Sequence, residues 1–176
     1  MGEIEIVEIE VTREIMMTLA LNPAKGRLGA RVFENRYIGL EPTLFYDIEL
    51  PLEPFVYEGE LRRTSVRLDF INLGVIGWRE LAGRSFDFPK NPAPGYIDGS
   101  IYLGGVHNPV HVGTIHFGQC DERQLAARIE LMFDFEYEGL VELGVVGASW
   151  DIVLEFDPDQ IDAAAAEARD FTGFIS

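Results

Sequence analysis

The sequence predicts a mainly β protein (α+β), in which an antiparallel β-sandwich or a curled sheet carries one C-terminal helix at about residues 158–171. Three observations support this class. Apolar and polar residues alternate along several segments, as half-buried antiparallel strands require. Turn-forming pairs such as Asn22-Pro23 and Asn108-Pro109 separate these segments at short intervals. Only one segment combines helical spacing of apolar residues with helix caps. At 176 residues, the chain is expected to form a single domain, 1–176.

The N-terminal part contains the less regular strands. In residues 4–11, Ile4 and Ile6 lie in one phase of the alternation, whereas Ile9 and Val11 lie in the other. A one-residue bulge near Val7 would bring all four side chains onto one face. Further extended segments are expected at residues 13–21, 29–39, 43–50 and 60–71.

A loop and a hairpin are expected in the middle of the chain. Residues 88–95 carry three prolines, which cannot donate to a strand ladder, so this segment is a loop and a candidate functional loop. Residues 95–103 are expected to form a hairpin. Asp98-Gly99 would be its two-residue type I′ turn, because glycine readily takes positive φ and aspartate tolerates it.

The clearest strand is predicted at residues 125–137, where apolar side chains occupy every second position from Leu125 to Tyr137. Residues 146–156 are expected to form its neighbour, with the connection near Glu138-Gly139 and Gly144. One face of this pair is apolar and the other mostly polar, so the pair is expected to cover a core with one side only.

The C-terminal helix has identifiable ends. Asp157 can cap it, Pro158 suits the first helical position, and Gln160 stands three residues after the cap, as in a capping box. Gly173 can end the helix. The apolar stripe consists of Ile161, Ala164, Ala165, Ala168 and Phe171. A short helical turn is also expected at residues 77–83.

The charge balance limits the classes of partner. The chain has 30 Asp and Glu against 14 Lys and Arg, which gives a net charge of −16. A field of this sign repels nucleic acid and anionic membranes, so neither is expected as a partner. It would speed the encounter with a basic protein partner, and it also keeps a protein soluble. The oligomeric state is not fixed by the sequence.

Three features predict a cytoplasmic location. Cys120 is the single cysteine, so an intrachain disulfide cannot form, which fits a reducing compartment. The first residues are acidic where a signal peptide would be basic. No apolar run is long enough for a membrane-spanning helix.

The stretch from residue 104 to 118 holds every histidine of the chain, namely His107, His111 and His116. A bulge at Gly113 would bring the apolar residues of 110–117 into phase on the core face and place His111 and His116 together on the outer face. The spacing matches no metal signature, and zinc needs further ligands, so the histidines are expected to be solvated or structural rather than metal ligands. A binding surface is the second interpretation, with Asn108 in the turn beside His107.

Other residues give weaker indications of a functional site than the histidines do. The carboxylates of Asp134 and Glu136 lie on the outer face of the strand at 125–137, where a solvated face is the simplest interpretation. The chain lacks the phosphate-binding and dinucleotide-binding glycine motifs and the nucleophile elbow of the α/β-hydrolases. No cofactor is therefore expected.

Two functional hypotheses remain. The first is a non-enzymatic, acidic, cytoplasmic binding protein of immunity or inhibitor type that holds a basic protein partner. Small bacterial immunity proteins have this general profile of size, charge and location, although no residues carry the resemblance. A contiguous acidic patch around exposed aromatic residues would favour this hypothesis over evenly spread charge. The second is a small-ligand or metal-binding enzyme that uses the histidine stretch 107–116 in the concave face of a curled sheet.

Overall fold

The computed structural model describes residues 19–74 and 76–172. The predicted strand at 4–11 and residues 13–18 of the next predicted segment lie outside the described residues. The described strands are β1 (Gly26–Asn35), β2 (Leu40–Pro51), β3 (Phe55–Tyr57), β4 (Glu60–Arg62), β5 (Ser65–Ile71), β6 (Ser85–Asp87), β7 (Asp98–Leu103), β8 (Val106–Cys120), β9 (Gln124–Asp134) and β10 (Val145–Phe156). Short 3₁₀ turns span Arg36–Ile38 and Trp78–Glu80, and α1 spans Pro158–Thr172.

Seven of these strands close into a β-barrel, so the mainly β class is confirmed but the predicted sandwich is wrong. The neighbours run in the order β8-β7-β5-β2-β1-β10-β9, and β9 pairs with β8 to complete the ring. Every pair of neighbours in this ring except β1 and β10 is antiparallel. Because the number of strands is odd, the barrel strands that come first and last along the chain, β1 and β10, point the same way. β1 and β10 therefore pair in parallel, with Gly26 beside Leu154.

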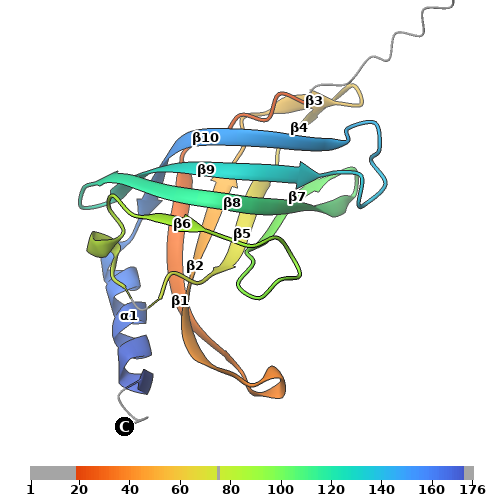
Figure 1. The fold of residues 1–176 in the computed structure, drawn as a ribbon. Coiled ribbons are helices and arrows are strands. Elements are labelled where there is room, and N and C mark those ends of the chain that lie inside the picture. Colours follow the sequence, from red (N-terminus) through yellow and green to blue (C-terminus); the bar gives the residue numbers. More distant parts are fainter. Residues whose placement is uncertain (1–18, 75, 173–176) are drawn as a thin grey trace, which may run out of the picture.

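The long strand β8 links different parts of the fold. Its first residues pair with β7, whereas its later residues pair with the short edge strand β6, and β9 follows it along its other side. Figure 1 shows β8, β9 and β10 lying across β1, β2 and β5. β3 and β4 form a separate two-stranded hairpin.

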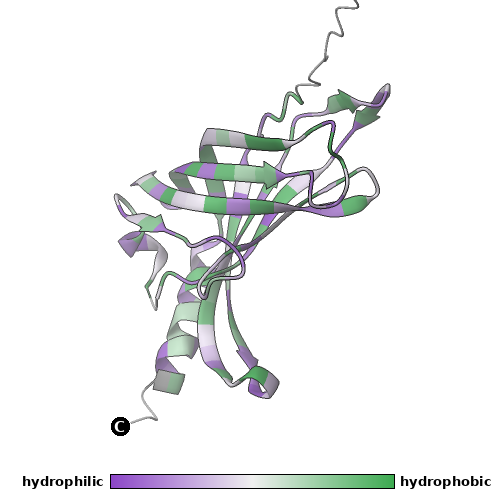
Figure 2. Ribbon diagram, turned by 45° about the vertical axis from the view of Figure 1, so that its right-hand side comes forward, coloured by the Kyte–Doolittle hydropathy of each residue, from purple (hydrophilic) through white to green (hydrophobic). Residues whose placement is uncertain are grey.

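Apolar side chains fill the space that the strands enclose. The alternation predicted for 125–137 is confirmed as far as β9 extends, since Leu125, Ala127, Ile129, Leu131 and Phe133 are all buried. The strand ends at Asp134, and Tyr137 lies exposed in the turn that follows. β10 confirms the predicted neighbour at 146–156. Green and purple alternate along these strands in Figure 2, as expected when one face of a strand is buried.

The predicted turn at Asp98-Gly99 is wrong, because both residues lie inside β7. The turn is formed by Gly104 and Gly105, which have φ values of +65° and +83°. Two positive φ angles suit a type I′ hairpin turn. Gly99 is needed for a different reason: a Cβ atom there would lie 2.1 Å from the carbonyl oxygen of Val110.

Other predicted segments change their boundaries. The segment 29–39 becomes β1 followed by a 3₁₀ turn, and 60–71 divides into β4 and β5. Residues 19–21 are not in a strand. The loop at 88–95 and the helical turn at 77–83 are confirmed, the latter as the 3₁₀ turn at Trp78–Glu80.

The predicted C-terminal helix is confirmed, and it packs against β1 and β2 (Figure 1). Asp157 caps it by accepting a hydrogen bond from the backbone N–H of Asp159 at 3.1 Å. Gln160 does not complete a capping box; its side-chain amide instead bonds the backbone N–H and carbonyl of Ala30. Four residues of the predicted stripe are buried, namely Ile161, Ala164, Ala165 and Ala168, whereas Phe171 in the last turn is exposed. In the described part of the chain, no helix is both long and apolar enough to cross a bilayer.

Candidate functional site

The histidine stretch lies on β8, and the bulge predicted at Gly113 is confirmed. The register with β9 shifts between Val112 and Thr114. The bulge keeps four apolar side chains in the core, Val110, Val112, Ile115 and Phe117. His111 and His116 are consequently displayed on the outer face of the barrel.

His107 and Asn108 lie where β7 and β8 meet. The His107 ring packs edge-on against the Tyr102 ring, with centroids 5.3 Å apart. Asn108 is completely buried, and its Nδ2 donates to the carbonyls of Leu103 and Val106 at 3.0 and 3.2 Å. Its Oδ1 has no hydrogen-bond partner among the described residues. Asn108 therefore holds the hairpin together and has no surface to offer a partner.

His111 and His116 line different grooves. His111 lies beside Phe88, Lys90 and Glu130. Burial lowers the pKa of His111 below 6.5, Lys90 lowers it further, and Asp134 opposes them. The Nδ1 atom of His116 is 2.7 Å from the Ser85 hydroxyl, a hydrogen bond that ties β8 to β6.

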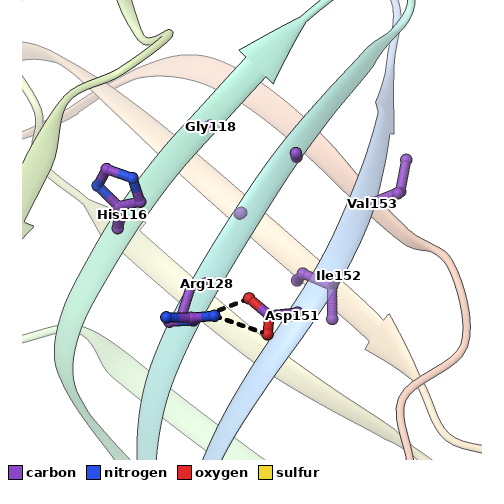
Figure 3. Close-up of a pocket in the computed structure, with 8 residues that line it drawn as sticks. His116, Gly118, Arg128, Asp151, Ile152 and Val153 are labelled. Atoms are coloured by element: carbon purple, nitrogen blue, oxygen red, sulfur yellow. Dashed lines mark hydrogen bonds and ion pairs between the residues drawn. The ribbon is translucent and has the colours of Figure 1, made fainter.

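The groove beside His116 is an open surface in which Arg128 and Asp151 form an ion pair with each other. Figure 3 shows Arg128 and Asp151 joined by two hydrogen bonds, with His116 on the neighbouring strand. The bonds measure 2.8 and 2.9 Å, and they lower the pKa of Asp151. Among residues 19–74 and 76–172, no three His, Cys, Asp or Glu side chains are grouped so that they could hold a metal ion.

The two predicted carboxylates lie near the end of β9. The Oδ1 atom of Asp134 accepts a hydrogen bond from the backbone N–H of Tyr137 at 3.2 Å, and Glu136 lies in the turn itself. Asp134 therefore stabilises the β9–β10 connection. Neither residue lines the groove of His116 or the groove of His111.

A larger groove, which the sequence did not indicate, lies on the outer face of β1, β2 and β5. It is about 650 Å³ in volume and is mostly apolar. The β1–β2 hairpin forms one side and the loop between β6 and β7 the other (Figure 1). We call it the aromatic groove and define it by its lining: Phe33, Asn35, Ile38, Leu40, Phe45, Phe70, Asn72, Pro94, Gly95, Tyr96 and Asp98.

Three phenylalanines from three strands form the aromatic part of this groove. The rings of Phe33 and Phe45 both meet the ring of Phe70 edge-on, at centroid distances of 5.3 and 5.5 Å. Such pairs contribute about 0.5–1.5 kcal/mol each beyond the burial of their area. The cluster is therefore a stable apolar surface that remains partly open to solvent.

A bulge in β5 places Phe70 in this cluster. Tyr46 pairs with Ile71 and Ile48 pairs with Leu68, so Asp69 and Phe70 together face the single residue Asp47. Phe70 has a φ of 59°, a left-handed conformation that is rare for a bulky residue. Because of the bulge, Asp69 and Phe70 both project from the outer face, while Leu68 and Ile71 remain buried.

Carboxylates lie beside the cluster on the same outer face. Arg31 pairs with Asp47 at 3.3 Å and more distantly with Asp69 at 3.8 Å, and its guanidinium lies 5.2 Å from the centre of the Phe70 ring. Burial raises the pKa of Asp47 above 3.8, although Arg31 lowers it. The position opposite Asp47 is Gly29, where a Cβ atom would lie 2.8 Å from the carboxylate.

The functional role predicted for the loop at 88–95 stays a prediction, and the structure shows where the loop lies. Pro94 and Gly95 line the aromatic groove, while Phe88 and Lys90 line the groove of His111. The loop therefore separates two surface grooves. Phe33 and Phe45 could have been found from the sequence, because each is an aromatic residue in the outward phase of its strand.

Comparison of this chain with protein-family models, with curated proteins and with solved structures found no match.

Proposed function

We propose that this protein is a non-enzymatic binding protein that holds a basic protein partner at the aromatic groove. The observation that carries the proposal is the groove itself, a mostly apolar surface built around Phe33, Phe45 and Phe70 with Asp69 and Asp98 at its margin. Aromatic side chains are enriched at the energetic centres of protein interfaces, and surrounding polar residues exclude water from them.

Exposed residues extend the groove on the β1–β2 hairpin. Tyr37 is fully exposed and Ile38 is 75% exposed, and both belong to the 3₁₀ turn at the tip of this hairpin. Figure 1 shows the hairpin projecting away from β8, β9 and β10. A projecting aromatic residue beside an apolar groove gives a partner a contact surface that is larger than the groove alone.

The charge of the protein supports the class of partner rather than the location of the site. Acidic residues occur on the barrel strands, on α1 and on the connecting turns, as Asp151, Asp162 and Glu138 illustrate. This spread is not the contiguous acidic patch expected for the hypothesis, so the proposal rests on the groove. The net charge would still attract a basic partner from a distance and raise the association rate. The contact itself then depends on a local surface, which the aromatic groove supplies. An inhibitor of immunity type that neutralises a basic protein would act in this way.

Peptide selection with the purified protein tests the proposal. A displayed library of random short peptides is selected on the wild-type protein, and the selected peptides are then measured against two variants. Ile38→Ser/Tyr96→Ser alters the groove. Tyr137→Ser/Val145→Ser is the matched control, because it removes one exposed aromatic and one exposed aliphatic side chain elsewhere.

Selected peptides are expected to be rich in lysine or arginine and to bind the groove variant at least about tenfold more weakly, a loss of about 1.4 kcal/mol. They should bind the control variant as they bind the wild type. The proposal would be wrong if no peptide were selected, or if both variants bound the selected peptides equally well.

A further inference from the structure

Two carboxylates oppose each other directly at the edge of the aromatic groove. Asp69 on β5 and Asp98 on β7 are cross-strand partners in an antiparallel pair. The neighbouring pair, Leu68 and Gly99, points into the barrel, so Asp69 and Asp98 both point outward. Like charges directly opposite each other in a sheet destabilise it. The folded protein therefore holds a repulsive pair at its candidate binding site.

The cations nearby neutralise this pair only in part. Arg31 is the closest, but it is 3.3 Å from Asp47 and 3.8 Å from Asp69, so its charge is shared. Within residues 19–74 and 76–172, Asp98 takes part in no ion pair. Arg67, two residues before Asp69, lies opposite Glu49 on β2 and opposite Ser100 on β7. A further positive charge at Asp69 and Asp98 would thus be favourable.

The apolar lining of the aromatic groove begins beside this pair. Phe70 follows Asp69 in the chain, and Asp98 lines the groove together with Tyr96. A ligand that places an apolar side chain against the phenylalanine cluster would have its neighbouring side chains close to both carboxylates. Aromatic faces beside carboxylates also suit a cation, because each ring attracts positive charge.

We propose that Asp69 and Asp98 form the cation-binding end of the aromatic groove, and that they select partner segments in which a lysine or arginine neighbours an apolar anchor residue. This inference rests on the proposed function, and it names the residues that determine specificity. The bound cation would relieve the repulsion between the two carboxylates, so the two sites of contact, ring cluster and carboxylate pair, would be occupied by one segment.

The test combines isosteric changes on both sides of the contact. The variant Asp69→Asn/Asp98→Asn removes both charges with little change of shape. The control Asp134→Asn/Glu136→Gln changes the net charge equally at another surface, so long-range attraction is matched. The probe is the peptide selected on the wild-type protein that depends most strongly on the groove, made with each arginine in turn as the neutral isostere citrulline, or each lysine as norleucine.

We expect one cationic position at which neutralisation weakens binding to the wild type and to the control by about tenfold or more. The same neutralisation should change binding to Asp69→Asn/Asp98→Asn by less than about twofold, since the partner charges are then absent. Asp98→Asn alone should raise the midpoint of thermal unfolding of the free protein, which a purely structural carboxylate would not do.

The outcomes separate the two proposals. Neutralising a cation of a groove-dependent peptide could weaken its binding to Asp69→Asn/Asp98→Asn as much as its binding to Asp134→Asn/Glu136→Gln. Only this inference would then be overturned, because the cation would act through general attraction. If groove-dependent peptides carry no essential cation, the inference is likewise overturned while the groove remains a binding site. If no peptide depends on the groove, both proposals are overturned together.

Discussion

At the scale of the single residue, Phe70 decides whether the aromatic groove exists. Its φ of 59° is needed to turn the ring onto the outer face beside Phe33 and Phe45. A left-handed conformation costs an L-residue about 1–2 kcal/mol, and glycine escapes most of this cost. Such conformations persist where the surrounding structure determines them, and they are common at functional sites. The two edge-on ring contacts offset part of the cost here.

This conformation reverses the usual ranking of small residues in a strand. Glycine in a strand is normally less stable than alanine by about 0.5–1 kcal/mol. At position 70 we expect the opposite, because Phe70→Ala keeps a Cβ atom at positive φ whereas Phe70→Gly does not. Urea unfolding should show Phe70→Gly to be more stable than Phe70→Ala by about 1 kcal/mol.

Position 66 provides a control for this comparison. Val66 is a buried residue of the same strand, and it pairs regularly with Leu50 and Ile101. Val66→Ala should therefore be more stable than Val66→Gly. Finding alanine more stable than glycine at both positions would contradict the role given to the Phe70 backbone.

At the scale of the element, α1 completes a sheet edge that the strands leave open. β10 pairs with β1 only over residues 26–28, so Ala30 has no strand partner on that side. The side-chain amide of Gln160 takes the place of a strand partner. Its oxygen accepts a hydrogen bond from the Ala30 N–H at 3.3 Å, and its nitrogen donates one to the Ala30 carbonyl. One side chain thus satisfies both backbone groups of a buried residue and fixes the start of α1 on β1.

Removing this amide should loosen α1. Gln160→Ala leaves the N–H and carbonyl of Ala30 without their partner, and we expect a loss of about 1 kcal/mol in the free energy of unfolding. The value lies at the low end of the range for unsatisfied groups, because Gln160 is itself exposed and water can reach it. Gln119→Ala, at an exposed position of β8, is the control and should change stability little.

Hydrogen exchange locates the effect. The amide of Ala30 is expected to exchange faster in Gln160→Ala, while the amides in the centre of β9 keep their protection relative to global unfolding. Unchanged exchange at Ala30 would show that the Gln160 amide does not hold this edge.

Some features of the strands could be predicted from the sequence and others could not. The alternation on β9 and the bulge at Gly113 were predicted, because both follow from the local pattern of apolar residues. The hairpin turn was placed at Asp98-Gly99 instead of Gly104-Gly105. Gly99 is required by the approach of the Val110 backbone, a residue distant along the chain, and no local pattern reveals such a contact.

The site was less predictable than the strands. The three histidines are near each other in the sequence, yet β8 places His111 and His116 in different grooves. The aromatic groove combines β1, β2, β5 and the loop before β7, and it depends on a bulge at Asp69–Phe70. Residues that are remote in sequence and individually ordinary give no motif until the register of the strands is known.

At the scale of the whole molecule, closure of the barrel is what brings the parts of the groove together. An odd number of alternating strands places β1 parallel to β10, and this pairing is short. β1 and β2 therefore extend beyond it as a hairpin arm, which α1 supports near its base and which forms one side of the groove. Alternation along single strands is the same in a sandwich and in a barrel, so the sequence could not distinguish the two.

The net charge of −16 acts on this closed molecule as a whole. Most arginines of the described part that form ion pairs are exposed, and exposed pairs contribute little to stability. Repulsion among the excess carboxylates opposes the compact state, because unfolding moves like charges apart. Salt shortens the range of this repulsion to about 3–10 Å at ionic strengths between 1 M and 0.1 M.

We therefore expect sodium chloride to stabilise the protein. Raising its concentration from about 0.02 M to about 0.5 M should increase the midpoint of thermal unfolding by a few degrees, which corresponds to about 1 kcal/mol for a chain of this size. Potassium chloride should act equally, since the effect is one of ionic strength. The variant Asp134→Asn/Glu136→Gln, with two fewer negative charges, should show a smaller increase. A midpoint that falls with added salt would mean that the ion pairs on the barrel surface contribute more than the repulsion, and the acidic charge could then be retained without a cost to stability.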